Sequence, residues 1–215
     1  MHTVLSTKML SQAQKNLLLN AGIALVEYNA IKIELVDFTC DEVIPNGIIT
    51  SQNAAKEIIN RNIKIENVFC VGEKTAAFLK ENGFNIVEIS HYGKNLAEIL
   101  YARYSNRIFT FFCGDKRRDD IPLILREKNI KIKEIGVYKT ALVPKAFEQK
   151  FDGILFFSPT AVKSFMIKNH LGETPVFCIG TTTASEAKNY TQNIIIATKP
   201  TIENVIVQVV KKFKI

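Results

Sequence analysis

The amino-acid sequence predicts an α/β protein built from two similar lobes, and two observations support this fold class. Apolar segments of strand length alternate with amphipathic segments of helix length along most of the chain, which is typical of parallel sheets covered by helices on both faces. A pair of strand-to-helix turns also occurs twice, at a spacing of about 107 residues, as expected of a chain that contains two related units. We therefore expect two doubly wound parallel-sheet lobes with a shared cleft.

The repeated unit consists of two buried strands, each of which runs into a polar turn and then a helix. Ser51 and Gly72 follow the two strands of the first copy, and Ser158 and Gly180 follow those of the second. A glycine lets the backbone approach a ligand closely, and a serine at the start of a helix caps it while N–H groups point outward. Four such helix starts predict a site for one polyanion. For any single turn, an ordinary helix cap is the alternative.

The first residues predict a strand, a turn and a helix. Val4–Thr7 has the pattern of a short strand, and Lys8 stands in the turn after it. Leucine and alanine side chains at helical spacing predict a helix over residues 11–21, which Gly22 ends. Residues 23–37 form a long strand-like run whose second part alternates apolar and polar side chains. That alternation favours a connector exposed on one face over a central parallel strand.

The strand-and-helix pattern continues through the middle of the chain. Strands are expected over residues 47–51, 67–71, 84–89 and 108–113, and the helices that follow them over residues 53–60, 73–82, 96–104 and up to 128. A second ribbon-like run, residues 130–142, is expected to pair with residues 31–37. After the second copy of the repeat, the chain ends with a strand at 194–197 and a helix at 202–213.

Pairing of the two ribbon-like runs divides the chain into lobes. One lobe is expected to contain residues 1–30 and 144–215. The second, residues 38–137, is inserted into the first. Residues 31–37 and 138–143 then form a connecting two-stranded β-ladder, and two strands that cross between lobes are expected to act as a hinge.

The bulk composition favours a soluble cytoplasmic protein. Apolar residues make up 47% of the 215 residues, which is enough for extensive cores. No apolar run approaches the roughly 20 residues that span a bilayer. The first five residues lack the charged segment and apolar core of a secretion signal.

Cysteines and histidines predict neither a metal site nor a cysteine nucleophile. The four cysteines form no Cys-x-x-Cys pair, and the three histidines are isolated, so metal-ligand spacing is absent. No histidine can be paired with a nucleophilic cysteine from the sequence. We therefore interpret the cysteines as reduced core residues: Cys40, Cys70, Cys113 and Cys178.

The net charge of +7 gives weak support to an anionic ligand. The lysines are scattered, and no basic stripe with interleaved aromatic residues marks a nucleic-acid surface. Lys116, Arg117 and Arg118 form one basic cluster at a predicted helix start, where the helix dipole disfavours cations. Either the neighbouring aspartates neutralise this cluster, or one arginine, with Arg118 as the candidate, binds a carboxylate.

Five short motifs follow one another along nearly the whole chain. In order, they are Val-Gly72-Glu-Lys-Thr75-Ala76, Cys-Gly114-Asp-Lys-Arg-Arg118, Val-Tyr138-Lys-Thr140, Phe-Phe-Ser158-Pro159-Thr160-Ala161-Val162 and Ile-Gly180-Thr-Thr182-Thr183-Ala184. Together they resemble the uroporphyrinogen-III synthase family of tetrapyrrole biosynthesis. One departure is visible, because Gln52 replaces the proline that often follows the first serine in that family.

The resemblance implies a fold, a substrate and a reaction. It implies two α/β lobes joined by a two-stranded ladder, which act without metal or organic cofactor. The implied substrate is hydroxymethylbilane, a linear tetrapyrrole with an acetate and a propionate on every ring. The implied reaction is loss of its terminal hydroxyl and ring closure with inversion of ring D. The sequence leaves the oligomeric state open, with a monomer as the default expectation, and transient contact with the preceding enzyme of the pathway is a further expectation.

The resemblance also implies roles for single residues. Tyr138 matches a tyrosine near the interlobe ladder and is expected to donate a hydrogen bond to the departing hydroxyl, although an aromatic residue packed at the hinge is the alternative. Three threonines match residues that face the cleft, with helix capping as the alternative. The remaining expected substrate contacts come from basic side chains and turn residues. The complete set of expected substrate-binding residues is Lys8, Ser51, Gly72, Thr75, Gly114, Arg118, Ser158, Gly180, Thr182 and Thr183.

Two other function classes compete with this interpretation. A non-catalytic two-lobed protein that binds an anionic metabolite as a sensor would use the same helix starts. A nucleotide-dependent enzyme is less favoured, because neither a Gly-x-Gly-x-x-Gly motif nor a Walker loop follows a strand.

Overall fold

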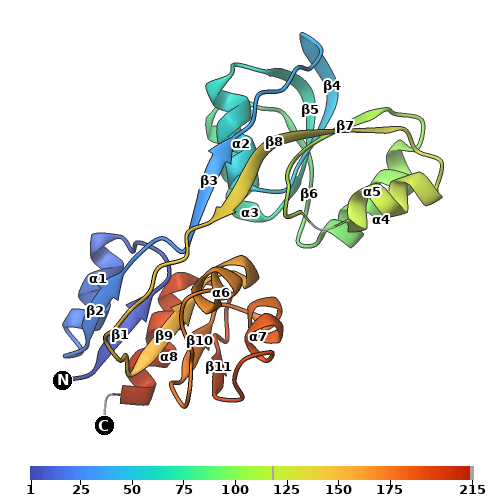
Figure 1. The fold of residues 1–215 in the computed structure, drawn as a ribbon. Coiled ribbons are helices and arrows are strands. Elements are labelled where there is room, and N and C mark those ends of the chain that lie inside the picture. Colours follow the sequence, from blue (N-terminus) through green and yellow to red (C-terminus); the bar gives the residue numbers. More distant parts are fainter. Residues whose placement is uncertain (118, 214–215) are drawn as a thin grey trace. The chain divides into compact units, whose positions relative to one another are not determined.

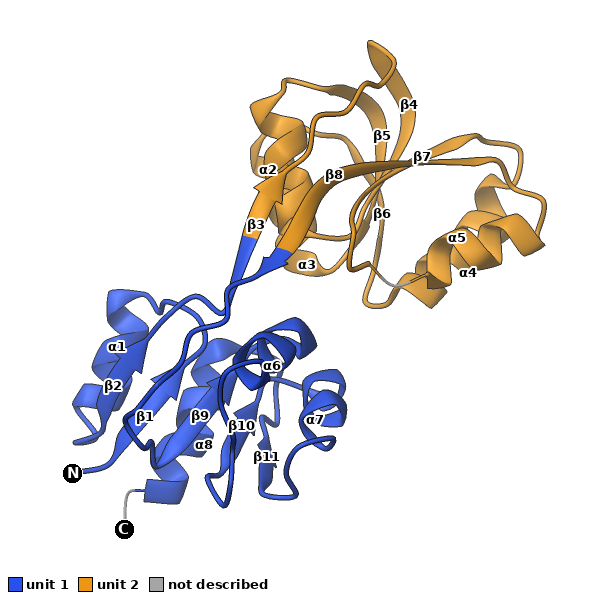
Figure 2. Cartoon of the chain, in the orientation of Figure 1, with its two compact units in different colours: residues 1–32, 141–215 blue, residues 33–140 orange. Residues whose placement is uncertain are grey.

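The computed structural model describes residues 1–117 and 119–213, which divide into two compact units (Figure 1, Figure 2). Unit 1 contains Met1–Lys32 and Ala141–Ile215, and unit 2 contains Ile33–Thr140. Each unit is a largely parallel sheet with helices on both faces. This architecture confirms the predicted α/β fold class, in which one lobe is inserted into the other.

Unit 2 contains a six-stranded sheet in the order β3-β8-β7-β4-β5-β6. Its strands are β3 (Ile31–Leu35), β4 (Val43–Ile49), β5 (Lys64–Val71), β6 (Ile86–Ser90), β7 (Phe109–Gly114) and β8 (Ile132–Leu142). Its helices are α2 (Gln52–Asn60), α3 (Glu73–Glu81), α4 (Gly93–Tyr104) and α5 (Asp120–Glu127). Side chains from α2 and α3 form the core on one face of the sheet, and those from α4 and α5 form the core on the other.

Unit 1 contains a five-stranded sheet in the order β11-β10-β9-β1-β2. Its strands are β1 (Thr3–Ser6), β2 (Ala24–Glu27), β9 (Gly153–Phe156), β10 (Val176–Cys178) and β11 (Ile194–Ile196). Its helices are α1 (Gln12–Leu19), α6 (Pro159–Met166), α7 (Thr181–Ala187) and α8 (Ile202–Phe213). Helices α6 and α7 contribute to the core on one face, and α1 and α8 to the core on the other.

The two sheets have the same strand order once the repeat is used to align them. Strands β4 to β8 correspond in turn to β9, β10, β11, β1 and β2. When these strands are numbered one to five along each repeat, both sheets have the spatial order 3-2-1-4-5, and β3 is an additional strand in unit 2. Phe69 pairs with Ile48 in one unit, and Phe177 pairs with Leu155 in the other. All four side chains are fully buried. The repeat in the sequence is therefore a repeat of buried strand positions.

The long run at residues 23–37 is two strands and not one. Strand β2 pairs with β1 in unit 1, whereas β3 joins the edge of the sheet in unit 2. Between them, the backbone N–H groups of Tyr28 and Ala30 donate to carbonyls at the end of β1, and both side chains are buried. Burial of these two residues in the core of unit 1 interrupts the run, which the sequence pattern alone did not reveal.

Strands β3 and β8 link the two units covalently, because each passes from one unit into the other (Figure 2). The Val36 N–H donates to the Val137 carbonyl, and the Val143 N–H donates to the Ala30 carbonyl. Partner numbers rise on one segment as they fall on the other, so the pairing is antiparallel. It is the pairing expected for residues 31–37 and 130–142.

Helix and loop ends show the local signals that the sequence carries. Ser11 caps α1 in a capping box with Gln14, and Gly22 has a φ of +73° just after the helix.

None of the helices in the described residues is both long and apolar enough to cross a membrane.

Buried thiols predict that the protein loses stability at alkaline pH. Burial raises the pKa of Cys70 and of Cys178 from 9.0 to about 12. The folded state thus keeps these protons at a pH where the unfolded chain has released them. The free energy of unfolding should fall as the pH rises from about 9 toward 12.

Urea unfolding at several pH values checks this expectation. A Cys70→Ala/Cys178→Ala variant lacks both thiols, so its free energy of unfolding should fall less steeply above pH 9 than that of the wild type. Equal pH slopes for the two proteins would contradict the prediction.

Candidate functional site

The carboxyl edge of the sheet in unit 2 is the first candidate site. Strands β4 and β7 are neighbours at the centre of this sheet, and the chain winds outward from them in opposite directions. Ligands of doubly wound proteins bind outside the carboxyl ends of strands at such a point. A cavity of about 290 Å³ lies there, and its lining includes Ser51, Gly114 and Tyr138.

Tyr138 is positioned by β8 and by the start of α2. Its hydroxyl donates a hydrogen bond to Ser51 Oγ at 3.2 Å. The same Oγ accepts from the Ala54 N–H at 3.1 Å and so caps α2. Two residues expected to contact substrate therefore lie in direct contact, in one unit, at the wall of one cavity.

A register shift in β8 accompanies this placement. Cys113 pairs with Gly136, but the next residue of β7, Gly114, pairs with Tyr138. Neighbours on a regular strand point to opposite faces. Here Val137 and Tyr138 both contact the core cluster between the sheet and α2 and α3. The shift thus directs the tyrosine ring across the end of β7.

Gly114 is required by the position of that ring. A Cβ atom at residue 114 would lie 2.3 Å from Tyr138 Cζ and 2.8 Å from its hydroxyl oxygen. Any side chain other than hydrogen would displace the ring. The role of Gly114 in the cavity is therefore to make room for Tyr138.

The four helix starts of the repeat fall into two classes. Ser51 and Ser158 cap α2 and α6, each with its Oγ accepting an N–H at 3.1 Å. Gly72 and Gly180 stand at the N-cap positions of α3 and α7, and neither helix has a side-chain cap. Uncapped first-turn N–H groups are the donors that bind anions at helix N-termini. The two glycine turns are therefore the better anion sites of the four.

Gly72 and Gly180 differ in whether the backbone conformation requires glycine. Gly72 has a φ of +89°, which an L side chain rarely adopts. Gly180 is extended, and a Cβ atom there would meet open space. Its conformation does not require glycine, but the absent side chain leaves the backbone N–H groups beyond it accessible.

The threonines of these helices do not act as caps, because glycines occupy both N-cap positions. Thr75 and Thr183 are buried, with 6% and 1% of their surface exposed, whereas Thr182 is exposed. Of the three expected to face the ligand, Thr182 is thus the most accessible within its unit.

Basic side chains also line the cavity of unit 2. Its wall includes His91, Lys116 and Arg117. Arg117 forms ion pairs with Asp119 and Glu134, and Lys116 Nζ lies 3.8 Å from Asp115 Oδ2. In this part of the basic cluster, carboxylates neutralise the cations, as one of the two interpretations of the sequence anticipated. Arg118 lies outside the described residues.

Sequence reasoning missed His91 as a cavity residue. It follows β6 directly, so its position after a strand was the available signal. A parallel sheet brings residues that follow different strands to one edge, which an isolated histidine in the sequence does not reveal.

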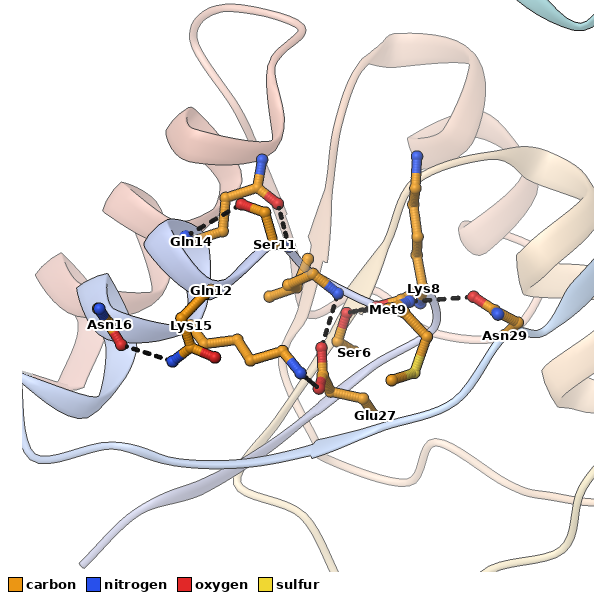
Figure 3. Close-up of polar contacts among 11 residues, drawn as sticks. Ser6, Lys8, Met9, Ser11, Gln12, Gln14, Lys15, Asn16, Glu27 and Asn29 are labelled. Atoms are coloured by element: carbon orange, nitrogen blue, oxygen red, sulfur yellow. Dashed lines mark hydrogen bonds and ion pairs between the residues drawn. The ribbon is translucent and has the colours of Figure 1, made fainter.

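Lys8 lies at the corresponding edge of unit 1, in the loop between β1 and α1 (Figure 3). Its side chain is exposed, and within the described part of the chain no carboxylate lies within ion-pair distance of its Nζ. In Figure 3 the Lys8 side chain extends away from the polar contacts around Glu27. An unpaired ammonium is available to a carboxylate ligand.

Among residues 1–117 and 119–213, no three histidine, cysteine or acidic side chains are grouped as metal ligands. Cys113, at the end of β7, is buried, and burial raises the pKa of its thiol.

A larger cavity of about 790 Å³ belongs to unit 1, with Asp152, Asn169 and Pro175 in its wall. These residues lie at or before the amino ends of β9 and β10, away from the repeated turns. It contains none of the residues expected to bind substrate, so size alone does not identify the site.

The chain matches the family model described as uroporphyrinogen-III synthase HemD over residues 12–206. It is 30% identical to uroporphyrinogen-III synthase from Saccharomyces cerevisiae over 132 residues, covering 51% of this chain and 47% of that protein. It is 26% identical to porphyrin biosynthesis protein HemD from Ruminiclostridium josui over 220 residues, covering 86% of this chain and 43% of that protein. The chain thus spans less than half the length of these two curated relatives.

Two solved structures share the fold. The uroporphyrinogen-III synthetase of Helicobacter pylori superposes with a TM-score of 0.76 at 17% identity, covering 99% of this chain and all of that one. A uroporphyrinogen III synthase from Thermus thermophilus gives a TM-score of 0.67 at 13% identity, covering 99% of this chain and 98% of that one.

Proposed function

This chain belongs to the uroporphyrinogen-III synthase family, and we propose that it cyclises hydroxymethylbilane to uroporphyrinogen III with inversion of ring D and loss of water. The observation that carries the proposal is the family match, which extends over residues 12–206 and so includes both units. The repeated helix starts with uncapped N–H groups support a substrate that bears many carboxylates.

The proposed reaction asks little acid or base chemistry of the protein. The terminal hydroxyl takes up a proton and leaves as water, which gives an azafulvene cation. The substituted carbon of ring D attacks this cation to form a spiro-pyrrolenine. The bond that originally linked ring D to ring C then breaks. The other α-carbon of ring D forms the new bond to ring C and loses its proton, so ring D is inverted in the product. The enzyme must mainly hold the flexible chain so that the inverted closure outcompetes the direct one.

We assign the hydrogen bond to the departing hydroxyl to Tyr138. Its O–H lies at the cavity of unit 2 and donates to Ser51 Oγ at 3.2 Å, a neutral contact that a substrate hydroxyl can replace. Donation of a hydrogen bond to the leaving oxygen stabilises the charge that develops there. Ser51 then serves to orient the tyrosine in the absence of substrate.

Carboxylate binding is assigned to Lys8, Arg118, the turns at Ser158 and Gly180, and the start of α3. Lys8 offers an exposed ammonium with no ion pair to the described residues, and α3 and α7 offer N–H groups without a side-chain cap. Convergence of these groups from both units on one substrate stays a prediction. So do the cytoplasmic location, the monomeric state and the transient contact with the enzyme that supplies hydroxymethylbilane.

Product analysis tests the proposed function. Purified chain is mixed with hydroxymethylbilane, the products are oxidised, and the porphyrin isomers are separated by chromatography. We expect isomer III to predominate, while a reaction without protein yields isomer I by spontaneous closure. Isomer I alone in the presence of the protein would reject the enzyme and favour the alternative of a non-catalytic binding protein or sensor for an anionic metabolite.

A further inference from the structure

The structural repeat makes two glutamates equivalent. In unit 2, hydrogen-bonded strand neighbours form the row Phe69, Ile48, Phe111, Glu134. In unit 1, the matching row is Phe177, Leu155, Ser6, Glu27. Because both rows start at the phenylalanine of the repeated turn, Glu27 on β2 and Glu134 on β8 occupy the same place.

Glu27 holds the loop that carries Lys8. Its Oε1 accepts the Leu10 N–H at 2.7 Å, and its Oε2 lies 2.6 Å from Lys15 Nζ on α1 (Figure 3). Only 11% of the Glu27 side chain is exposed. Asn29, just beyond it, accepts the Met9 N–H at 3.0 Å. The two residues that follow Lys8 are therefore hydrogen-bonded to the edge strand β2 and to the segment just after it.

Glu134 makes the matching contacts in unit 2. It pairs with Arg117, in the loop after β7, and with Arg126 on α5. Its side chain is 16% exposed. Each glutamate thus joins its own strand, β2 or β8, to the loop and the helix that follow the neighbouring strand. An equivalent glutamate thus holds the loop that contains Lys8 in unit 1 and the loop that follows Gly114 in unit 2.

The ion pair with Lys15 matters for the charge at the site. A carboxylate that is nearly buried needs a cation and hydrogen-bond donors to offset its loss of hydration. Lys15 supplies the cation and the Leu10 N–H supplies a hydrogen-bond donor, so Glu27 does not need Lys8 as a partner. Lys15 thus helps to fix the loop, while Lys8 has no ion pair within residues 1–117 and 119–213 and can bind a ligand carboxylate.

We propose that Glu27 is a positioning residue, which fixes the β1–α1 loop so that the Lys8 ammonium is presented to a carboxylate of the substrate. Glu134 has the equivalent role for the loop of Gly114. The proposal rests on the proposed function for the identity of the ligand. It concerns the placement of Lys8 and assigns Glu27 no contact with the substrate.

A double-mutant cycle on the full chain tests the role of Glu27. Lys8→Ala, Glu27→Ala and the double variant are assayed for KM and kcat with hydroxymethylbilane. They are also titrated with uroporphyrin III, a macrocycle with an acetate and a propionate on each ring. Each single variant should raise KM and the Kd for uroporphyrin about ten-fold with kcat little changed, because one charge-assisted contact is lost. The double variant should raise them no further than Lys8→Ala does, because both changes act through one ammonium.

Asp152→Asn is the matched control. Asp152 Oδ2 accepts the Thr3 N–H at 2.7 Å, and Oδ1 pairs with His2, so its contacts resemble those of Glu27. It lies at the amino end of the strands, and its loss should lower thermal stability and leave KM and Kd unchanged.

Any one of four results would overturn the proposal. In the first, Glu27→Ala lowers the melting temperature but leaves KM and Kd unchanged. In the second, the effects of the two single variants on KM and Kd multiply in the double variant. In the third, Lys8→Ala binds uroporphyrin as the wild type does. Failure of the wild type to bind uroporphyrin would overturn it as well. Isomer I as the sole product of the wild type would instead reject the proposed function, and the uroporphyrin titration would still decide the role of Glu27.

Discussion

Tyr138→Phe is expected to lower kcat about 100-fold, the lower end of what a positioned proton donor contributes. The substitution removes the hydroxyl that donates to Ser51 and, in the proposed mechanism, to the departing hydroxyl of the substrate. The ring keeps its packing against the end of β7 and the core of unit 2, because phenylalanine has the same ring. Initial-rate measurements with hydroxymethylbilane, together with thermal unfolding, check the expectation.

Tyr104→Phe provides a control for the loss of a tyrosine hydroxyl in the same unit. The Tyr104 hydroxyl donates to Glu88 Oε1 at 2.9 Å, and neither residue lines the cavity. We expect this variant to keep the wild-type kcat. A Tyr138→Phe enzyme with unchanged kcat would show that Tyr138 is a packed aromatic residue and not a proton donor.

The sequence pattern was sufficient to predict the fold class. The two copies of the repeat can be aligned from their residues alone, and this alignment identifies equivalent buried strands before any strand pairing is known. Phe69 and Phe177 are the clearest example, since both lie in the sequence Phe-Cys-x-Gly and both occupy the second strand of the repeat. The break at residues 28–30 was not predictable from periodicity. It arises from contacts with the end of β1, which are distant in sequence.

Three of the residues expected to contact substrate lie together in the structure, but their geometry was not predictable from the sequence. Ser51, Gly114 and Tyr138 were expected to bind substrate, and they line one cavity, yet their mutual contact depends on a register shift that leaves no mark in the sequence. The threonine of the first repeat, Thr75, was expected to face the ligand, but it is buried in its unit. Glu27 was missed because its partners, at positions 10 and 15, are brought near by the parallel pairing of β1 and β2.

Gly114→Ala is expected to impair catalysis by displacing Tyr138. The new methyl group would lie within 2.3–2.8 Å of three atoms of the tyrosine, so the ring and its hydroxyl must move. Movement breaks the hydrogen bond to Ser51, and kcat should fall about as far as in Tyr138→Phe, on the order of 100-fold. Crowding of a packed position should also cost about 1–3 kcal/mol of stability. Initial rates and urea unfolding measure the two effects separately.

The control for Gly114→Ala lies on the paired strand. Gly136 on β8 has open space where a Cβ would stand, so Gly136→Ala should leave kcat unchanged. Adding Gly114→Ala to Tyr138→Phe should lower kcat little further, because the hydroxyl that the methyl group would displace is already absent. If the two effects on kcat instead multiply, Gly114 acts on the reaction independently of Tyr138, for example through direct backbone contact with the substrate.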